Sequence, residues 1–184
     1  MLEVRFHGRG GQGTVVATII LAKAFFDAGY YVQTFPLFGV ERRGAPVEAY
    51  LRLARDKIRI RTNVYTPDHV VVQDAQLLGR VQVTSGLKPA GRILINTKSV
   101  PEDLSPFDGF RLAWVDAARM AVQNGLGTPT HPMVNTAMVG AFARVLGMPP
   151  LAAVEEAIAG EIAARPEANV TAARQAYESV QLAR

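Results

Sequence analysis

The stretch Leu2-Glu3-Val4-Arg5-Phe6-His7 alternates apolar and polar side chains and leads directly into Gly8-Arg9-Gly10-Gly11-Gln12-Gly13. A long apolar segment from Thr14 to Ala28 follows, in which the apolar side chains recur at three- and four-residue steps. This succession predicts a strand, a glycine turn and a helix that ends at Gly29. The glycine spacing matches the fingerprint of a dinucleotide-binding turn between a strand and a helix.

Further strands and helices are predicted outward from this turn. Valine- and isoleucine-rich runs predict buried central strands, and alternation over Lys57 to Arg61 predicts a strand that forms a hairpin with the one before it. The expected strands are 30–35, 47–53, 57–61, 68–74, 92–97 and 110–116, and the expected helices are 75–83, 132–146, 151–164 and 167–182. The alternation predicts an α/β fold with a mostly parallel sheet, flanking helices and a helical C-terminal part without strands. We expect a single domain over 1–184, with an α/β core in 1–130 that helices 131–184 complete.

Composition narrows the class of protein. The chain has 184 residues, of which 49% are hydrophobic and 20% charged, as in a globular protein with one well-filled core. It has no cysteine, so it cannot by itself hold an iron–sulfur cluster or a thiolate zinc site. There is no leader pattern at Met1 and no apolar run long enough to span a bilayer, so we expect a cytoplasmic protein without membrane contact.

Positive charge gathers in the first half of the chain. The net charge is +4, and residues 1–92 carry thirteen basic and seven acidic side chains. The basic stretch Arg52, Arg55, Lys57, Arg59 and Arg61 suits a nucleic-acid partner in principle. Charges on one face of a short strand also protect a sheet edge, and we favour that interpretation because no nucleic-acid-binding motif accompanies them. No nucleic-acid partner is therefore expected.

The glycine motif leaves two interpretations open. Its helix N-terminus can bind an anion such as a pyrophosphate, or its glycines can simply let the helix pack close to the strand. An NAD site also needs an acidic residue near the end of the second strand, and Tyr30-Tyr31-Val32-Gln33-Thr34-Phe35 has none. A stand-alone nucleotide-binding protein is thus the alternative hypothesis, and the amide of Gln12 favours a ligand or subunit contact.

The connection from Pro36 to Pro46 is a second candidate site. It places Glu41 beside Arg42 and Arg43 and is rich in glycine and proline. The acid can pair with one arginine and fix the loop, or one guanidinium can remain free for a phosphate, a carboxylate or a partner surface. From the residues alone the internal ion pair is the preferred interpretation.

Other chemistry-bearing residues are scattered. His7, His69 and His131 show no metal-ligand spacing, and neither a nucleophile elbow nor a P-loop is present. Asn135 and Thr136 open a predicted helix, where they can cap its first turn or contact a ligand, and capping is the simpler assumption. The chain thus lacks a complete catalytic set, and no catalytic or metal-binding residue is predicted.

Taken together, the motifs resemble a known family. His7-Gly8-Arg9-Gly10-Gly11-Gln12-Gly13, Phe35-Pro36-x-Phe38-Gly39-x-Glu41-Arg42-Arg43-Gly44-Ala45-Pro46-Val47, Pro67-Asp68, Ile95-Asn96-Thr97 and Asn135-Thr136-Ala137-Met138-x-Gly140-Ala141 occur in this order. The set is similar to the gamma subunit of pyruvate:ferredoxin oxidoreductase and related 2-oxoacid:acceptor oxidoreductases. The glycine motif alone is unspecific, whereas the Glu-Arg-Arg-Gly-Ala-Pro loop in this setting is specific.

The resemblance implies a Rossmann-like, non-catalytic subunit that aids assembly and access of coenzyme A. The complex would convert a 2-oxoacid, most simply pyruvate, to acyl-CoA and CO2 while reducing ferredoxin. Thiamine diphosphate, Mg and iron–sulfur clusters would be held by thiamine-binding alpha and beta subunits and a ferredoxin-like delta subunit. The residues implied as cofactor-binding are Gly8, Arg9, Gly10, Gly11, Gln12, Gly13, Glu41, Arg42, Arg43, Gly44, Asn135 and Thr136.

Overall fold

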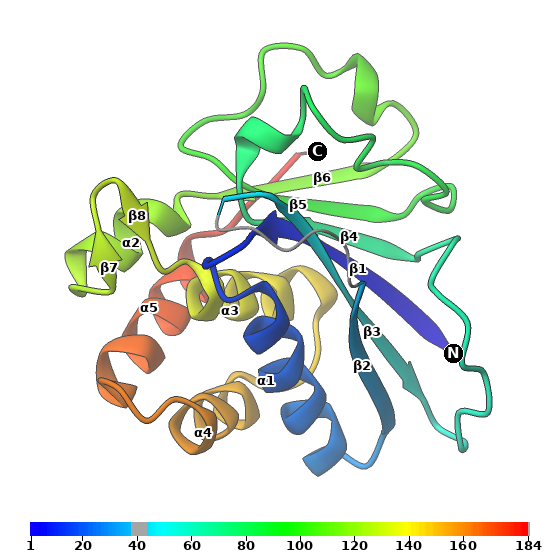
Figure 1. Ribbon diagram of the computed structural model, residues 1–184, viewed down its shortest axis with the longest axis horizontal. Helices are drawn as coiled ribbons and strands as arrows, with labels where there is room; N and C mark the ends of the chain where they lie inside the picture. Colours follow the sequence, from blue (N-terminus) through cyan, green and yellow to red (C-terminus); the bar gives the residue numbers. More distant parts are fainter. Residues whose placement is uncertain (38–43, 184) are drawn as a thin grey trace.

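The computed structural model describes residues 1–37 and 44–183, so Glu41, Arg42 and Arg43 lie outside the described residues. A seven-stranded sheet in the order β2-β3-β1-β4-β5-β6-β9 forms its centre (Figure 1). The strands are β1 (Leu2–Arg9), β2 (Tyr31–Leu37), β3 (Pro46–Ala54), β4 (His69–Val72), β5 (Arg92–Asn96), β6 (Arg111–Val115) and β9 (Gln181–Leu182). A separate pair, β7 (Gly127–Thr128) and β8 (His131–Pro132), forms a small hairpin.

The sheet confirms the predicted α/β fold. Strands β1, β4, β5 and β6 are parallel neighbours, and β2 shares their direction because β3 is antiparallel to both β1 and β2. Only β3 and β9 run the other way among the strands of this sheet. The short apolar strands β4 and β5 are buried on both faces, as their continuous valine and isoleucine runs predict.

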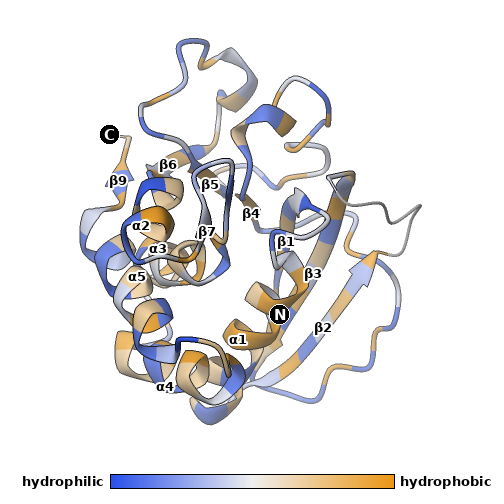
Figure 2. Cartoon of the chain, turned by 60° about the vertical axis from the view of Figure 1, so that its left-hand side comes forward, coloured by the Kyte–Doolittle hydropathy of each residue, from blue (hydrophilic) through white to orange (hydrophobic). Residues whose placement is uncertain are grey.

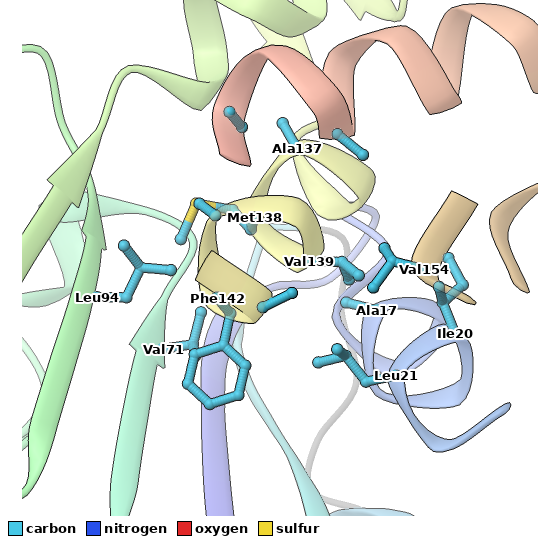
Figure 3. Close-up of a cluster of buried hydrophobic side chains, with 14 of the residues drawn as sticks. Ala17, Ile20, Leu21, Val71, Leu94, Ala137, Met138, Val139, Phe142 and Val154 are labelled. Carbon is cyan, nitrogen blue, oxygen red and sulfur yellow. The ribbon is translucent and has the colours of Figure 1, made fainter. Parts of the chain in front are cut away.

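All five α-helices of the described chain lie on one face of the sheet. They are α1 (Thr14–Asp27), α2 (Ala117–Gln123), α3 (Asn135–Leu146), α4 (Leu151–Glu161) and α5 (Pro166–Ser179). Phe142 of α3 packs between the strands and α1, close to Val71, Leu94 and Leu21 (Figure 3). Figure 2 shows α1 in largely hydrophobic colours, which fits its place in this core. Within residues 1–37 and 44–183, no helix is both long and apolar enough to cross a bilayer.

The opposite face is covered by irregular chain. Val70, Ile93 and Ile95 there contact Leu77 and Phe107, which belong to two 3-10 turns, η1 (Ala75–Leu77) and η2 (Ser105–Phe107). The predicted helix 75–83 was therefore wrong. The Asp74 side chain accepts a hydrogen bond from the backbone N–H of Gln76 (2.9 Å), which favours a tight turn there, and only one turn of 3-10 helix forms.

The predicted hairpin between 47–53 and 57–61 was also wrong. Both edges of β3 are already occupied, by β1 on one side and β2 on the other, so no strand from 57–61 can pair with it. Residues 57–61 form irregular chain instead. Two further corrections concern missed elements: α2, which begins after Asp116, and the short strands β8 and β9 in the part expected to hold only helices.

Candidate functional site

The glycine turn joins β1 to α1 as the sequence predicts. Gly11 and Gly13 have φ of 94° and 72°, a left-handed conformation that favours glycine. The backbone N–H of Arg9 donates to the Gln12 side-chain oxygen (2.9 Å), so this amide closes the turn. Gly13 is the N-cap of α1 and supplies no side-chain cap, so the helix start is a place where an anion is electrostatically favoured.

Two of the glycines are required by close packing. A Cβ at Gly8 would overlap the Thr14 hydroxyl and lie 2.7 Å from the side-chain oxygen of Gln73. A Cβ at Gly13 would lie 2.5 Å from Nδ2 of Asn135. The packing interpretation of the motif therefore accounts for Gly8 and Gly13, while Gly10 and Gly11 line open space at the turn.

Arg9 is held by an ion pair. Its Nε lies 2.6 Å from Asp74 Oδ2, and its Nη1 donates to the Gly44 carbonyl (3.1 Å). Gln12 also donates to Asp74 (3.3 Å), and the Gly44 N–H donates to the Gly10 carbonyl (3.0 Å). The structure thus brings Gly44 to the glycine turn, and Asp74 balances much of the positive charge that Arg9 would otherwise offer.

Two cavities meet at this turn and share Arg9, Gly10, Gly11 and Met133. The first has a volume of about 690 Å³ and mostly apolar walls, including Val15, Val16, Pro36 and Val47. The second has a volume of about 850 Å³ and more polar walls, including Gln12, Asp74, Gln76, Thr128, Thr130 and His131. Together they offer apolar surface, backbone groups and hydrogen-bonding side chains within reach of one ligand.

Glu48 was missed by the sequence analysis. It lies near the start of β3 opposite His7 and lines the apolar cavity. The Tyr50 hydroxyl donates to Glu48 (2.6 Å), and His7 Nδ1 lies 3.5 Å from the same carboxylate. The alternating pattern of β3 fixes the position of this side chain only once the pairing with β1 is known, so no local signal in the sequence marks it.

His7 belongs to a buried polar layer under β1 and β3. Burial, opposed by Glu48, lowers its pKa from 6.5 to about 4, so the imidazole is neutral near pH 7. Its Nε2 then accepts a hydrogen bond from Arg5 Nε (3.1 Å), and Arg5 donates to the Val83 carbonyl (3.1 Å). Burial together with the bond to Glu48 raises the pKa of Tyr50. The layer fixes Glu48 in one position at the cavity wall.

Asn135 and Thr136 differ in position. Asn135 is buried against Gly13, beside the turn. The Thr136 hydroxyl is fully buried and donates to Asn169 of α5 (3.0 Å), which removes it from ligand contact. Neither residue caps the helix, since the N-cap is Val134 without a side-chain hydrogen bond, so the expectation of capping was wrong.

The hairpin β7–β8 places His131 beside two threonines, Thr128 and Thr130, that the sequence analysis did not single out. The Thr128 and Thr130 hydroxyls lie 3.2 Å apart, and Thr130 lies 3.0 Å from Nδ1 of His131. The strands of this hairpin are two residues long, so no periodic pattern could reveal them. Across the described part of the chain, no three His, Asp or Glu side chains gather in a way that could hold a metal ion.

The fold and the site define a class, namely α/β proteins in which a glycine turn joins the first strand to the first helix beside a ligand-sized cavity. Residues 3–179 match the family described as pyruvate ferredoxin/flavodoxin oxidoreductase, and the chain belongs to that family. It is 49% identical over 189 residues to the "Pyruvate/ketoisovalerate oxidoreductases common subunit gamma" of Pyrococcus furiosus, covering 99% of this chain and 98% of that one.

Two further similarities agree with this assignment. The "Pyruvate synthase subunit PorC" of Methanocaldococcus jannaschii is 49% identical over 181 residues, covering 98% of this chain and 97% of the relative. The crystal structure of pyruvate oxidoreductase subunit PORC from Thermotoga maritima superposes with a TM-score of 0.84 at 37% identity, covering 100% of this chain and 98% of that one.

Proposed function

We propose that this chain is the gamma subunit of a pyruvate:ferredoxin oxidoreductase complex. The observation that carries the proposal is the 49% identity to the Pyrococcus furiosus gamma subunit over nearly the full length of both chains. The reaction converts pyruvate and coenzyme A to acetyl-CoA and CO2. Its two electrons pass to two oxidised ferredoxins and one proton is released, so atoms and charge balance.

In this proposal the redox cofactors are bound by partner subunits. The sequence has no cysteine and so supplies no thiolate for an iron–sulfur cluster. We assign thiamine diphosphate with Mg to alpha and beta subunits and the clusters to a ferredoxin-like delta subunit. The role of this chain is then assembly of the complex and shaping of the approach to its reaction centre.

The test is reconstitution of the complex with and without this chain. Co-expressed with the alpha, beta and delta subunits, the chain is expected to co-purify with them and to be required for full pyruvate-dependent ferredoxin reduction, whereas the isolated chain is expected to be inactive. Full activity of a stable complex that lacks the chain would overturn the proposal, as would oxidation of pyruvate by the isolated chain.

The cavity beside the glycine turn supports a second part of the proposal, namely that it admits coenzyme A. Its apolar walls suit the pantetheine arm, and the start of α1 favours a phosphate. The site comprises Gly8, Arg9, Gly10, Gly11, Gln12, Gly13, Gly44 and Asn135, with Glu41, Arg42 and Arg43 adjoining Gly44 in sequence. Thr136 is left out because Asn169 holds its buried hydroxyl.

Two glutamate variants on α1 test this part. Val16 lines the cavity, whereas Ile19, three residues further on and also half-buried, lines a different groove. In the assembled complex Val16→Glu is expected to raise the KM for coenzyme A by roughly tenfold, since its charge repels phosphates. Ile19→Glu is the matched control and should leave the KM for coenzyme A unchanged. Neither variant should change the KM for pyruvate.

The arginines next to Gly44 provide a further arm of the same assay. Arg42→Ala and Arg43→Ala remove the guanidinium groups that could bind an anion. A higher KM for coenzyme A with intact assembly would support their role. An unchanged KM for coenzyme A in these two variants and in Val16→Glu would show that coenzyme A does not bind in this cavity.

A further inference from the structure

Residues 55–61 form a basic segment with Arg55, Lys57, Arg59 and Arg61, and Asp56 is its single acid. The structure shows that this segment is not a strand and does not pair with any strand of the sheet. Lys57, Arg59 and Arg61 are exposed, and none makes an ion pair with an acid in residues 1–37 or 44–183. Neither strand pairing nor an ion pair within the described residues accounts for these charges.

The chain at both ends of the basic segment is nevertheless firmly held. Arg52 is buried and donates to the carbonyls of Thr62 (2.6 Å) and Asn63 (3.2 Å). The Tyr65 carbonyl packs so closely against Gly86 that a Cβ there would overlap it. At the other end, Arg55 donates to the Tyr30 hydroxyl (2.8 Å). The cations thus lie on chain that is tied to the rest of the fold at both ends.

The cations of the basic segment repel one another. Alternate residues of an extended chain are at most about 7 Å apart, which is within the Debye length of about 8 Å at physiological salt. Lys57, Arg59 and Arg61 therefore repel one another, with Asp56 as the nearest acid in sequence. An acidic surface bound against the segment would offset this repulsion, because its carboxylates would attract the cations.

Exposed aromatic and aliphatic side chains occur at the same end of the molecule. Tyr31 lies opposite Ala54, just before the basic segment begins, and is 51% exposed. Ile60 and Tyr65 are 44% and 72% exposed. Arginine together with tyrosine and aliphatic side chains is the composition of a protein interface, which favours a protein partner over a nucleic acid.

We infer that the basic segment docks an acidic face of a partner subunit in the same complex. This inference rests on the proposed function. The docking surface is separate from the glycine turn, because β3 ends at the opposite end of β1 from that turn (Figure 1). The length of β1 separates the two sites by roughly 20 Å. Variants in the basic segment therefore leave the proposed coenzyme A cavity intact.

The test is charge reversal in the co-expressed four-subunit complex. The triple variant Lys57→Glu, Arg59→Glu, Arg61→Glu is expected to reduce recovery of this chain with its partners by about tenfold or more. Recovery of the wild-type chain should fall as salt rises from about 0.1 M to about 0.5 M. The matched control is Arg80→Glu, Lys98→Glu, Arg111→Glu, three cations elsewhere on the surface, and it should assemble normally.

The outcomes separate this inference from the proposed function. If the wild-type chain itself fails to join the complex, the proposed function is wrong. If the wild-type chain joins and both triple variants assemble equally well or equally poorly, the docking inference is wrong. Salt-sensitive oligonucleotide binding that the basic-segment variant alone loses, with assembly intact, would reassign the surface to nucleic acid. Should the glutamate variant misfold, Lys57→Gln, Arg59→Gln, Arg61→Gln is expected to show a smaller loss, and normal recovery of that variant would overturn the inference.

Discussion

Gly140 of α3 lies against the backbone of Ala173 in α5. A Cβ at Gly140 would overlap the Ala173 carbonyl oxygen, a backbone atom that cannot move without shifting a helix. We predict that Gly140→Ala lowers the free energy of unfolding by about 1–3 kcal/mol or more. Urea denaturation of the purified chain measures this change.

Gly160 of α4 is the matched control for Gly140. It is exposed in a helix, and a Cβ added at this position would have no neighbouring atom within 4 Å. Gly160→Ala should therefore raise the free energy of unfolding by about 0.4–1 kcal/mol, because alanine restricts the unfolded chain. Equal effects at the two positions would contradict the close approach of α3 and α5.

Burial of His7 makes the stability of the folded chain depend on pH. Burial lowers its pKa to about 4 in the folded chain, from 6.5 in the unfolded chain. The unfolded chain therefore binds more protons between these values, so the stabilisation is complete above about pH 6.5 and is lost as the pH falls towards 4. At about pH 5 the expected loss from this residue is on the order of 1–2 kcal/mol.

The measurement compares urea midpoints of the wild-type chain and His7→Gln at about pH 7.5 and about pH 5. Glutamine keeps an acceptor for Arg5 but does not titrate, so the variant should lose less stability on acidification than the wild-type chain. Parallel losses in the two proteins would show that His7 does not carry this dependence. His69, whose pKa burial also lowers to about 4, remains present in both.

The segment after β3 depends on Arg52 for its conformation. Besides its two carbonyl partners, Arg52 lies 2.8 Å from Glu3 and is 1% exposed. Arg52→Met leaves that carboxylate and both carbonyls without their donor, so the free energy of unfolding should fall by about 3 kcal/mol. Amide hydrogen exchange should rise over 56–66 and not in α3.

Arg174 provides the comparison for Arg52. Its ion pair with Glu155 is at the surface, with the arginine side chain 50% exposed. Arg174→Met should therefore change stability by less than about 1 kcal/mol. If the two methionine variants were equally stable, Arg52 would not be the residue that fixes the segment.

The elements show where sequence patterns suffice. The central strands and the long helices were predicted because a continuous apolar run or a 3.6-residue period is set by the chain itself. Whether residues 57–61 form a strand depends instead on whether β3 has a free edge, and both of its edges are paired, one with β1 and one with β2. The sequence of 57–61 alternates well, yet neither edge of β3 is available to it.

The site was predictable only in part for a similar reason. The glycine turn is local, so its glycines and Gln12 could be identified directly. Asp74 and Glu48 reach the turn through the pairing of β4 and β3 with β1, which no short motif encodes. Thr136 was assigned to the site from the family resemblance, but its position on α3 turns it towards Asn169.

The order of the strands distinguishes the whole molecule from a dinucleotide-binding enzyme. In a typical dinucleotide fold the second strand lies beside the first and ends in an acid that binds the ribose. Here β3 is inserted between β1 and β2, which moves β2 about 10 Å from β1. Glu48 of β3 is the acid on the strand next to β1. Its carboxylate already accepts a hydrogen bond from Tyr50 and lies 3.5 Å from His7 Nδ1.

We therefore predict that the isolated chain does not bind NAD. Calorimetric titration with NAD to about 1 mM should give no saturable heat, because β2 contains no acid to bind the ribose hydroxyls and the Glu48 carboxylate is held by Tyr50. Glu48→Gln is the control, since it weakens an acceptor without opening a new site and should be equally silent. Micromolar NAD binding by the wild-type chain that Glu48→Gln abolishes would contradict this prediction. It would show that the Glu48 carboxylate gives up its hydrogen bond from Tyr50 and accepts hydrogen bonds from the ribose hydroxyls instead.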